Sequence, residues 1–185
     1  FGLLPLFDGK IFFNNQDISS LKPQERVLKG MSFVPQTNNI FQTMTVEENL
    51  EMGGFIRKNG IKETIGQIYE LFPILKEKKI QMAENLSGGQ RQQLAFGRAL
   101  MTKPIFLMLD EPSAGVSPII MDELFKKILD ISKQGVSILM VEQNAKQALK
   151  ISDIGFVLNQ GKNKFIDSGK NLLSNREVRE SFLGG

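Results

Sequence analysis

The chain has 185 residues, a net charge of +3, and neither cysteine nor histidine. This length allows one domain with a substantial core, and 41% hydrophobic with 23% charged residues is typical of a globular protein. Without cysteine the chain forms no disulfides or thiolate metal sites, and without histidine it lacks the commonest general base. No apolar run reaches the ~20 residues that span a membrane, so any membrane role must be peripheral. The basic cluster at residues 76–79 favours a solvated helix end, and we expect no nucleic-acid partner.

Five elements are expected in the first half of the chain. Thr45 is suited to cap a helix, and Glu47 and Glu48 in its first turn favour the positive end of the helix dipole. Pro35 ends the pairing of the strand before it, because proline has no N–H to donate. The expected strands cover residues 9–13 and 31–34, and the expected helices cover residues 45–58, 61–75 and 87–101. The helices lie between strands and therefore predict an inserted helical subdomain over about residues 45–101.

The second half alternates strands and helices. Residues 105–109 are wholly apolar and residues 136–141 nearly so, which predicts parallel strands that are covered on both faces. Between them Ser117 is expected to cap a helix with Pro118 at its first position, and the connection is expected to be a right-handed crossover. A C-terminal hairpin and a short helical tail follow. The whole chain is therefore predicted to be one α/β domain, with residues 102–185 forming its second part.

The segment Leu86-Ser87-Gly88-Gly89-Gln90 opens the third helix with an unusual composition. Ser87 and Gln90 fit a capping box, which by itself predicts only an ordinary helix start. Two glycines in a first turn lower helix stability by roughly 1 kcal/mol each relative to alanine, and a plain helix start gives no reason for them. Because glycine leaves backbone N–H groups uncovered, Gly88 and Gly89 would let a phosphate approach this helix end closely.

Two adjacent carboxylates, Asp110 and Glu111, follow the apolar run at residues 105–109. The carboxyl end of a buried strand is where α/β proteins usually place their sites. Adjacent carboxylates repel each other, and a bound cation would offset this repulsion. One carboxylate could then bind the cation and the other a reacting water. The alternative is a pair of solvated acids that open a turn at Pro112, which does not explain the unbroken apolar run before them.

These two segments, in this order and about fifteen residues apart, resemble the signature loop and the Walker B strand of the ATP-binding cassette (ABC) ATPases. The resemblance implies a P-loop NTPase-like α/β fold with a mostly parallel sheet, and an enzyme that binds ATP and Mg²⁺ and hydrolyses ATP. It implies that Asp110 holds Mg²⁺, usually through water, and that Glu111 orients and polarises the attacking water. The signature loop, residues 86–90, would contact the γ-phosphate bound by a second ATPase subunit in a head-to-tail dimer.

Two glutamines stand at the positions of two further motifs of this family. Gln36, which follows a strand and a proline, resembles the Q-loop and would touch Mg²⁺ or the water; on its own it would be a plain surface turn. Gln143 stands at the switch position, where many members have histidine; it can donate an amide hydrogen bond to the γ-phosphate but carries no charge. The alternative role of Gln143 is that of a polar residue before Asn144, which would cap the next helix. Ser117 stands where many members have aspartate, so only the helix-capping role of that position is retained.

Val141-Glu142-Gln143-Asn144-Ala145 and three further stretches are similar to one of the two ATPase subunits of branched-chain amino acid importers. The first stretch combines residues 39–41 with residues 45–50, and the other two cover residues 111–115 and 144–149. This resemblance implies an ATPase pair docked on two membrane permeases at the cytoplasmic face of the inner membrane, with a periplasmic binding protein that delivers the substrate. The alternatives are an importer for urea or amides, another ABC transporter, or a soluble ABC protein that acts on DNA or ribosomes.

The chain contains no phosphate-binding loop of the form G-x-x-x-x-G-K-[ST]. In the ABC family that loop lies upstream of the region where this chain starts, and residues 1–5 resemble the tail of its helix. We therefore expect a domain truncated at its N-terminus that lacks its first strands and its P-loop. The full-length protein would then be an active ATPase and this fragment alone would not. The alternatives are a protein that naturally lacks the loop and a remnant without activity.

Overall fold

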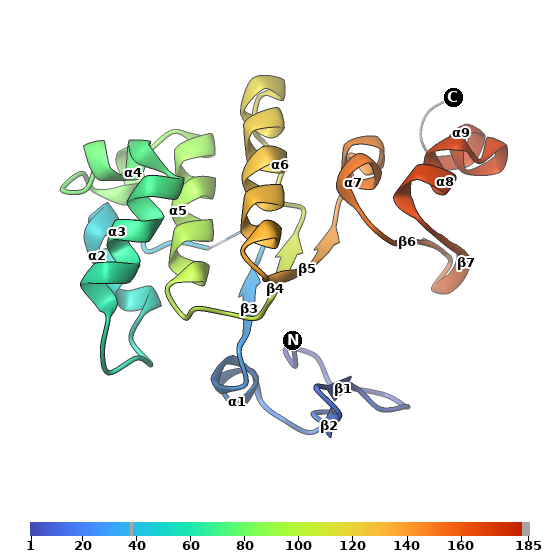
Figure 1. The fold of residues 1–185 in the computed structure, drawn as a ribbon, viewed down its shortest axis with the longest axis horizontal. Coiled ribbons are helices and arrows are strands. Elements are labelled where there is room, and N and C mark those ends of the chain that lie inside the picture. The colour runs from blue at the N-terminus through green and yellow to red at the C-terminus, as the bar shows by residue number, and fades with distance from the viewer. Residues whose placement is uncertain (38, 183–185) are drawn as a thin grey trace.

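The computed structural model describes residues 1–37 and 39–182, and a three-stranded parallel sheet forms its centre (Figure 1). In spatial order its strands are β3 (Met31–Val34), β4 (Phe106–Asp110) and β5 (Ser137–Val141). Met31 pairs with Phe106, and Phe106 pairs with Ser137, so the strands run in register toward one carboxyl edge. The three strands predicted for the middle of the chain are confirmed to within one residue at each end, and their parallel pairing confirms the predicted α/β class.

Between β3 and β4 the chain forms a group of helices at one end of the molecule (Figure 1). They are α2 (Val46–Gly53), α3 (Ile61–Leu71), α4 (Pro73–Glu77), a short 3₁₀ helix (Ala83–Asn85) and α5 (Gly88–Leu100). Thr45 caps α2 as predicted, because its hydroxyl accepts a hydrogen bond from the Glu48 N–H and its own N–H donates to the Glu48 carboxylate at 2.7 Å. These hydrogen bonds from Thr45 lower the pKa of Glu48.

Helix α2 is shorter than predicted, since it ends at Gly53 and not at residue 58. Gly53 lies so close to α5 that an added Cβ would be 2.4 Å from the Arg98 carbonyl oxygen. Gly54 takes the C-cap position. The two glycines therefore permit a close helix contact and end the helix.

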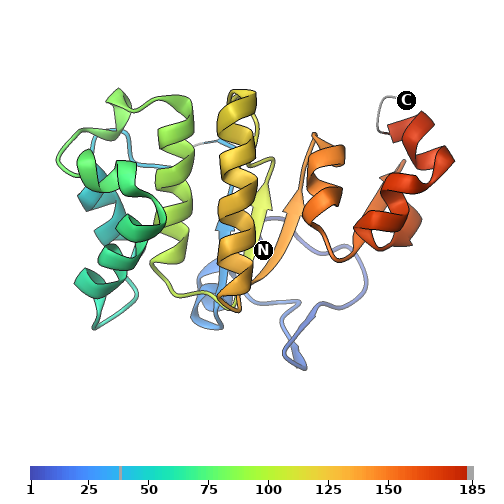
Figure 2. The ribbon, with the colours of Figure 1, turned by 45° about the horizontal axis from the view of Figure 1, so that its top comes forward.

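Helix α6 (Pro118–Lys133) connects β4 to β5 and stands beside α5 on one face of the sheet (Figures 1 and 2). The apolar side of α6 is buried in the core through Leu124, Phe125 and Ile128. The same core contains Leu107 and Leu109, the alternate residues of β4 that face the helices. Ser117 takes the N-cap position of α6, but its side chain makes no capping hydrogen bond with the described residues, so the capping contact predicted for it is absent there.

The opposite face of the sheet is open at β5, contrary to the prediction that both faces of this strand are covered. Leu139 and Val141 are 48% and 61% exposed. Within residues 1–37 and 39–182, no strand pairs with the outer edge of β5. An apolar run indicates what a strand can bury, whereas actual burial depends on the neighbours that are present. Among the described elements β5 is therefore an edge strand with an exposed apolar face.

The N-terminal segment forms a small hairpin and a short helix that the sequence did not fully predict. β1 (Phe12–Phe13) pairs with β2 (Gln16–Asp17) through Asn14 and Asn15, whose φ angles of +47° and +61° suit a type I′ turn. α1 (Pro23–Leu28) then leads into β3. The Phe13 ring lies 5.8 Å from the Phe106 ring, between centroids, so the hairpin covers part of β4 on the open face. A two-residue strand and a six-residue helix are too short for hydrophobic periodicity to reveal.

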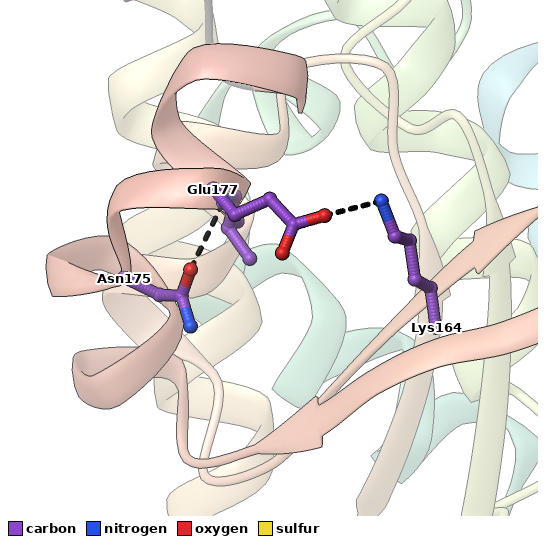
Figure 3. Close-up of polar contacts among 4 residues, drawn as sticks. Lys164, Asn175 and Glu177 are labelled. Atoms are coloured by element: carbon purple, nitrogen blue, oxygen red, sulfur yellow. Dashed lines mark hydrogen bonds and ion pairs between the residues drawn. The ribbon is translucent and has the colours of Figure 1, made fainter.

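The C-terminal part confirms the predicted hairpin and helical tail at the other end of the molecule. It contains α7 (Ala145–Ile151), β6 (Gly155–Asn159), β7 (Lys162–Asp167), α8 (Gly169–Ser174) and α9 (Arg176–Phe182). Figure 3 shows the Lys164–Glu177 ion pair between β7 and α9, beside Asn175, whose side-chain oxygen accepts from the Val178 N–H at 3.0 Å. In the part of the chain that the structure describes, no helix has the length and apolarity to cross a membrane.

Candidate functional site

The polar residues that the sequence singled out gather at the carboxyl edge of the parallel sheet. Gln36 follows β3 after Pro35, Asp110 ends β4 with Glu111 next to it, and Gln143 follows β5 by two residues. The in-register pairing of the three strands brings these chain segments to the same edge. In open α/β sheets this edge is where ligands bind.

Gln36 and Glu111 are in direct contact, although 75 residues separate them in the sequence. The Gln36 side-chain amide donates to a Glu111 carboxylate oxygen at 2.7 Å. Gln36 is exposed and Glu111 is half-buried, so the pair is open to solvent on one side. This contact fixes the Glu111 carboxylate where a water or a ligand could approach it.

The backbone of Glu111 adopts a left-handed conformation, with a φ of +43°. A residue with a side chain rarely adopts this conformation, and such strain collects at functional sites where the surroundings enforce it. The Glu111 N–H donates to the Val141 carbonyl at 2.8 Å, and the Ala114 N–H donates to the Glu111 carbonyl at 3.0 Å. The strained residue is therefore held from β5 on one side and by its own loop on the other.

The signature loop, residues 86–90, has the predicted capping box. The Gln90 N–H donates to the Ser87 hydroxyl at 3.3 Å, and the Ser87 N–H donates to the Gln90 side-chain oxygen at 3.0 Å. Ser87 and Gly88 are exposed. A Cβ at Gly88 would meet only the Gly115 carbonyl oxygen, at an ordinary 3.6 Å, so the fold does not require glycine there.

Gly89 has a packing reason that the sequence did not reveal. A Cβ at Gly89 would lie 2.7 Å from Cγ2 of Ile120 in α6, a distance that real Cβ atoms essentially never show. The close contact between α5 and α6 therefore explains this glycine without any ligand. Of the two glycines only Gly88 remains without a structural explanation, and its N–H lies at an exposed helix start.

Gln143 lies in the turn between β5 and α7, and its side chain is exposed. Its backbone carbonyl accepts from the Ala145 N–H at 2.9 Å, and Asn144 caps α7 by accepting from the Gln147 N–H at 3.4 Å. This geometry agrees with the helix-start alternative for Gln143, and it also leaves the amide free to reach a ligand at the carboxyl edge.

Glu142 is the polar residue at this edge to which the sequence gave no role. Its carboxylate accepts hydrogen bonds from the N–H and the hydroxyl of Ser113, at 2.7 and 2.9 Å, and from the Asn144 N–H at 3.1 Å. The signal that could have indicated it is its position, because it follows directly on β5 as Glu111 follows on β4.

Asp110, Glu111 and Gln36 offer oxygen donors, which suit Mg²⁺. This ion is usually bound by one or two carboxylates together with substrate phosphates. Asp110 is half-buried at the end of β4, next to the Glu111 carboxylate that Gln36 holds. In residues 1–37 and 39–182 no group of three or more His, Cys, Asp or Glu side chains could hold a metal ion. The oxygen ligands of Asp110, Glu111 and Gln36 are of the kind that holds Mg²⁺ together with phosphate oxygens.

Comparisons with known proteins show which family the chain resembles. Residues 1–114 match the sequence family described as ABC transporter. The chain is 43% identical over 178 residues to the high-affinity branched-chain amino acid transport ATP-binding protein BraG of Pseudomonas aeruginosa, covering 96% of the chain and 76% of BraG. It is 38% identical to the probable branched-chain amino acid transport ATP-binding protein LivF of Archaeoglobus fulgidus, covering 100% and 79%. The lipopolysaccharide export system ATP-binding protein LptB of Haemophilus influenzae is 31% identical, with 99% and 77% covered.

Solved structures give the same picture for the fold. The ADP conformation of MJ1267, an ATP-binding cassette of an ABC transporter, superposes with a TM-score of 0.82 at 28% identity, covering 100% of this chain and 80% of that one. The structure of CbiO1 from Clostridium perfringens, part of the transporter complex CbiONQ, superposes with a TM-score of 0.84 at 25% identity, covering 97% and 73%.

Proposed function

The chain belongs to the ABC transporter family of ATP-binding proteins, and from this premise we propose that it drives the import of branched-chain amino acids. Binding and hydrolysis of ATP by the full-length protein are the activity that membership implies. The proposal for the substrate is supported by one observation above others. Over nearly the whole chain, identity to the branched-chain amino acid proteins BraG and LivF is 43% and 38%, against 31% to LptB.

For the chemical step, we propose that Glu111 orients and polarises the water that attacks the γ-phosphate. The support is its position at the carboxyl edge, its strained backbone and its 2.7 Å hydrogen bond from Gln36. A carboxylate held in this way can accept a proton from water while the phosphoryl group is transferred. Gln36 then positions Glu111. It also connects the site to the helical subdomain, because it lies between β3 and the loop that leads to α2.

We assign the remaining contacts to the nucleotide and its ion. Asp110 would hold Mg²⁺, which supplies charge neutralisation at the phosphates when bound. Gln143 would donate its amide N–H to the γ-phosphate. Ser87, Gly88 and Gln90 at the start of α5 would face the γ-phosphate bound by a second ATPase subunit, since an exposed helix N-terminus favours anions. Gly89 contributes to this loop by letting α5 approach α6 closely.

A groove beside the helical subdomain supports the proposal that the chain docks on a membrane permease. The groove has a volume of about 300 Å³ and is lined by residues of α2, α5 and the segments after β3 and α2. Part of its apolar lining is exposed, with Phe55 at 80% and Ile56 at 45%, whereas Val34 and Ala95 in the same lining are buried. Arg98 lies 4.5 Å over the ring of Phe41 at the same groove. An apolar patch with a polar rim is typical of a protein interaction site, and the occupant we propose is a cytoplasmic segment of the permease. Phe55→Glu should then reduce co-purification with the permease, and unchanged co-purification would contradict this docking surface.

The test of the substrate is transport by the assembled complex. The full-length protein would be placed in liposomes with its permeases and second ATPase subunit, with the periplasmic binding protein on the opposite side of the membrane. We expect ATP-dependent uptake of leucine, isoleucine and valine. Uptake of urea or amides alone, or no uptake of any of these, would reject the branched-chain assignment while leaving the ATPase activity in place.

A further inference from the structure

Glu142 joins two loops at the carboxyl edge of the sheet. One of its carboxylate oxygens accepts from the Ser113 N–H at 2.7 Å, and the other accepts from the Ser113 hydroxyl at 2.9 Å and the Asn144 N–H at 3.1 Å. Ser113 is buried, with 8% of its surface exposed, and lies two residues after Glu111. Asn144 lies one residue after Gln143. A single side chain therefore connects the loop that carries Glu111 to the loop that carries Gln143.

The conformation of Glu111 depends on contacts of this kind. A positive φ in a glutamate is unfavourable and persists only where the surrounding structure enforces it. Two sets of hydrogen bonds constrain the backbone here. The Glu111 N–H binds the Val141 carbonyl directly before Glu142, and Ser113 binds Glu142 itself. Because charge-assisted hydrogen bonds are shorter and stronger than neutral ones, the Glu142 carboxylate is the stronger of the two constraints.

We infer that Glu142 is a positioning residue for the ATPase reaction: it fixes the backbone of Glu111 and the loop of Gln143 in one arrangement. This inference rests on the function proposed above for Glu111. Glu142 acts through the two loops and has no contact with the reacting atoms. Its removal should therefore affect the rate of the chemical step more than the binding of ATP.

The donor pattern requires a carboxylate at this position. Each of the two carboxylate oxygens accepts a backbone N–H, one from Ser113 and one from Asn144. Glutamine has the same shape, but its NH₂ group would replace one of these oxygens and would face a backbone N–H. Glu142→Gln thus removes one hydrogen bond and places two donors against each other, with almost no change in volume.

The experiment compares Glu142→Gln with Glu123→Gln in the full-length protein. Glu123 is an exposed glutamate on α6 and serves as the matched control. We expect Glu142→Gln to lower kcat by roughly tenfold to a hundredfold, since a misplaced catalytic group costs about this much. The KM for ATP should stay near the wild-type value, and kcat is compared at a temperature where all variants are fully folded, because the opposed donors also lower the melting temperature of Glu142→Gln. Ser113→Ala, which keeps the backbone hydrogen bond and loses the hydroxyl bond, should lower kcat by a smaller factor.

A wild-type kcat in Glu142→Gln at that temperature would overturn the inference, and so would a fall in kcat that occurs only where the variant is partly unfolded. If Glu142→Gln does not fold, Ser113→Ala decides: reduced kcat at an unchanged melting temperature supports the inference, and wild-type kcat contradicts it. Failure of the wild type to hydrolyse ATP would instead reject the proposed function. The link itself is then tested separately by NMR, because the amide signals of Ser113 and Asn144 should shift in Glu142→Gln and not in Glu123→Gln.

Discussion

At the scale of single residues, the site depends on how Glu111 is held. Its side chain accepts from Gln36, and its backbone is fixed in the left-handed region by Val141 and its own loop. The position of this glutamate after an apolar strand was readable from the sequence, because a resemblance placed it there. Its φ of +43° and the hydrogen bonds of Glu142 were not readable, since both arise from contacts between segments about thirty residues apart.

We predict that Glu111→Gln in the full-length protein abolishes steady-state ATP hydrolysis and retains ATP binding. The amide oxygen of glutamine can still accept from Gln36, so the local structure should persist while the base is lost. A general base contributes at least ~100-fold to kcat, and the loss should be of that size. Phosphate release and nucleotide binding would be measured beside Glu77→Gln, an exposed control in α4. Near-normal turnover by Glu111→Gln would require another residue in this role.

Gln143 allows a prediction about pH as well as rate. If its amide donates one hydrogen bond to the γ-phosphate, Gln143→Ala should cost roughly 1–3 kcal/mol of transition-state stabilisation. The helix start should survive, because the capping contacts use the Gln143 backbone and Asn144. Gln143→His should be tolerated, since imidazole can supply a donor.

The chain has no histidine, so wild-type kcat should show no histidine titration near pH ~6.5 from this subunit, whereas Gln143→His can acquire one. The measurement is kcat against pH for the wild type and both variants. Equal rates for the wild type and Gln143→Ala across this range would leave Gln143 as a helix-start residue only.

At the scale of elements, hydrophobic periodicity and capping residues located most helices and strands to within a few residues. Thr45 and Ser87 correctly marked the starts of α2 and α5, because a capping box acts locally. The predicted end of α2 was wrong. Gly53 lies against the neighbouring helix α5, and a local sequence pattern does not reveal such a contact. β2 and α1 were missed because each is shorter than the window that periodicity requires.

Substitutions at Gly88 and Gly89 of the signature loop should distinguish a packing role from a functional role. We predict that Gly89→Ala destabilises the fold by about 1–3 kcal/mol, because the new Cβ overpacks against Ile120. Combining it with Ile120→Ala should recover part of that loss. Gly88→Ala should leave the melting temperature unchanged or raise it, since alanine favours a helix and the site is open, yet it should lower ATPase activity. Equal melting temperatures for the two single variants would contradict the packing argument, and full activity of Gly88→Ala would contradict phosphate contact at this glycine.

At the scale of the whole molecule, the outer edge of β5 has no partner strand among the described residues, and its exposed face is apolar. Exposed edge strands of this kind promote association between chains. The sequence predicted the class of fold and the positions of the three parallel strands correctly. It could not predict this open face, because the composition of β5 is that of a strand covered on both sides.

We predict that the 185-residue chain expressed alone shows no measurable ATPase activity and self-associates. It contains no G-x-x-x-x-G-K-[ST] segment to bind phosphates, and β5 offers an edge for pairing. Leu139→Lys, which places a charge on the exposed face of β5, should reduce the association. Light scattering and phosphate release are the measurements. A monomeric chain that turns over ATP would show that this expectation is wrong.

The small C-terminal core has a consequence for the order in which parts of the molecule unfold. Leu149, Leu172 and Val178 form a hydrophobic cluster separate from the main one, and α7 contributes residues to both. Such a cluster can act as its own cooperative unit, which unfolds locally at a lower free energy than the rest. Amide protons of β6, β7 and α8 should therefore exchange with deuterium sooner than those of α5. Thermal unfolding should then proceed in two steps. The C-terminal part should unfold first and the main core later, with α7 at the boundary between them.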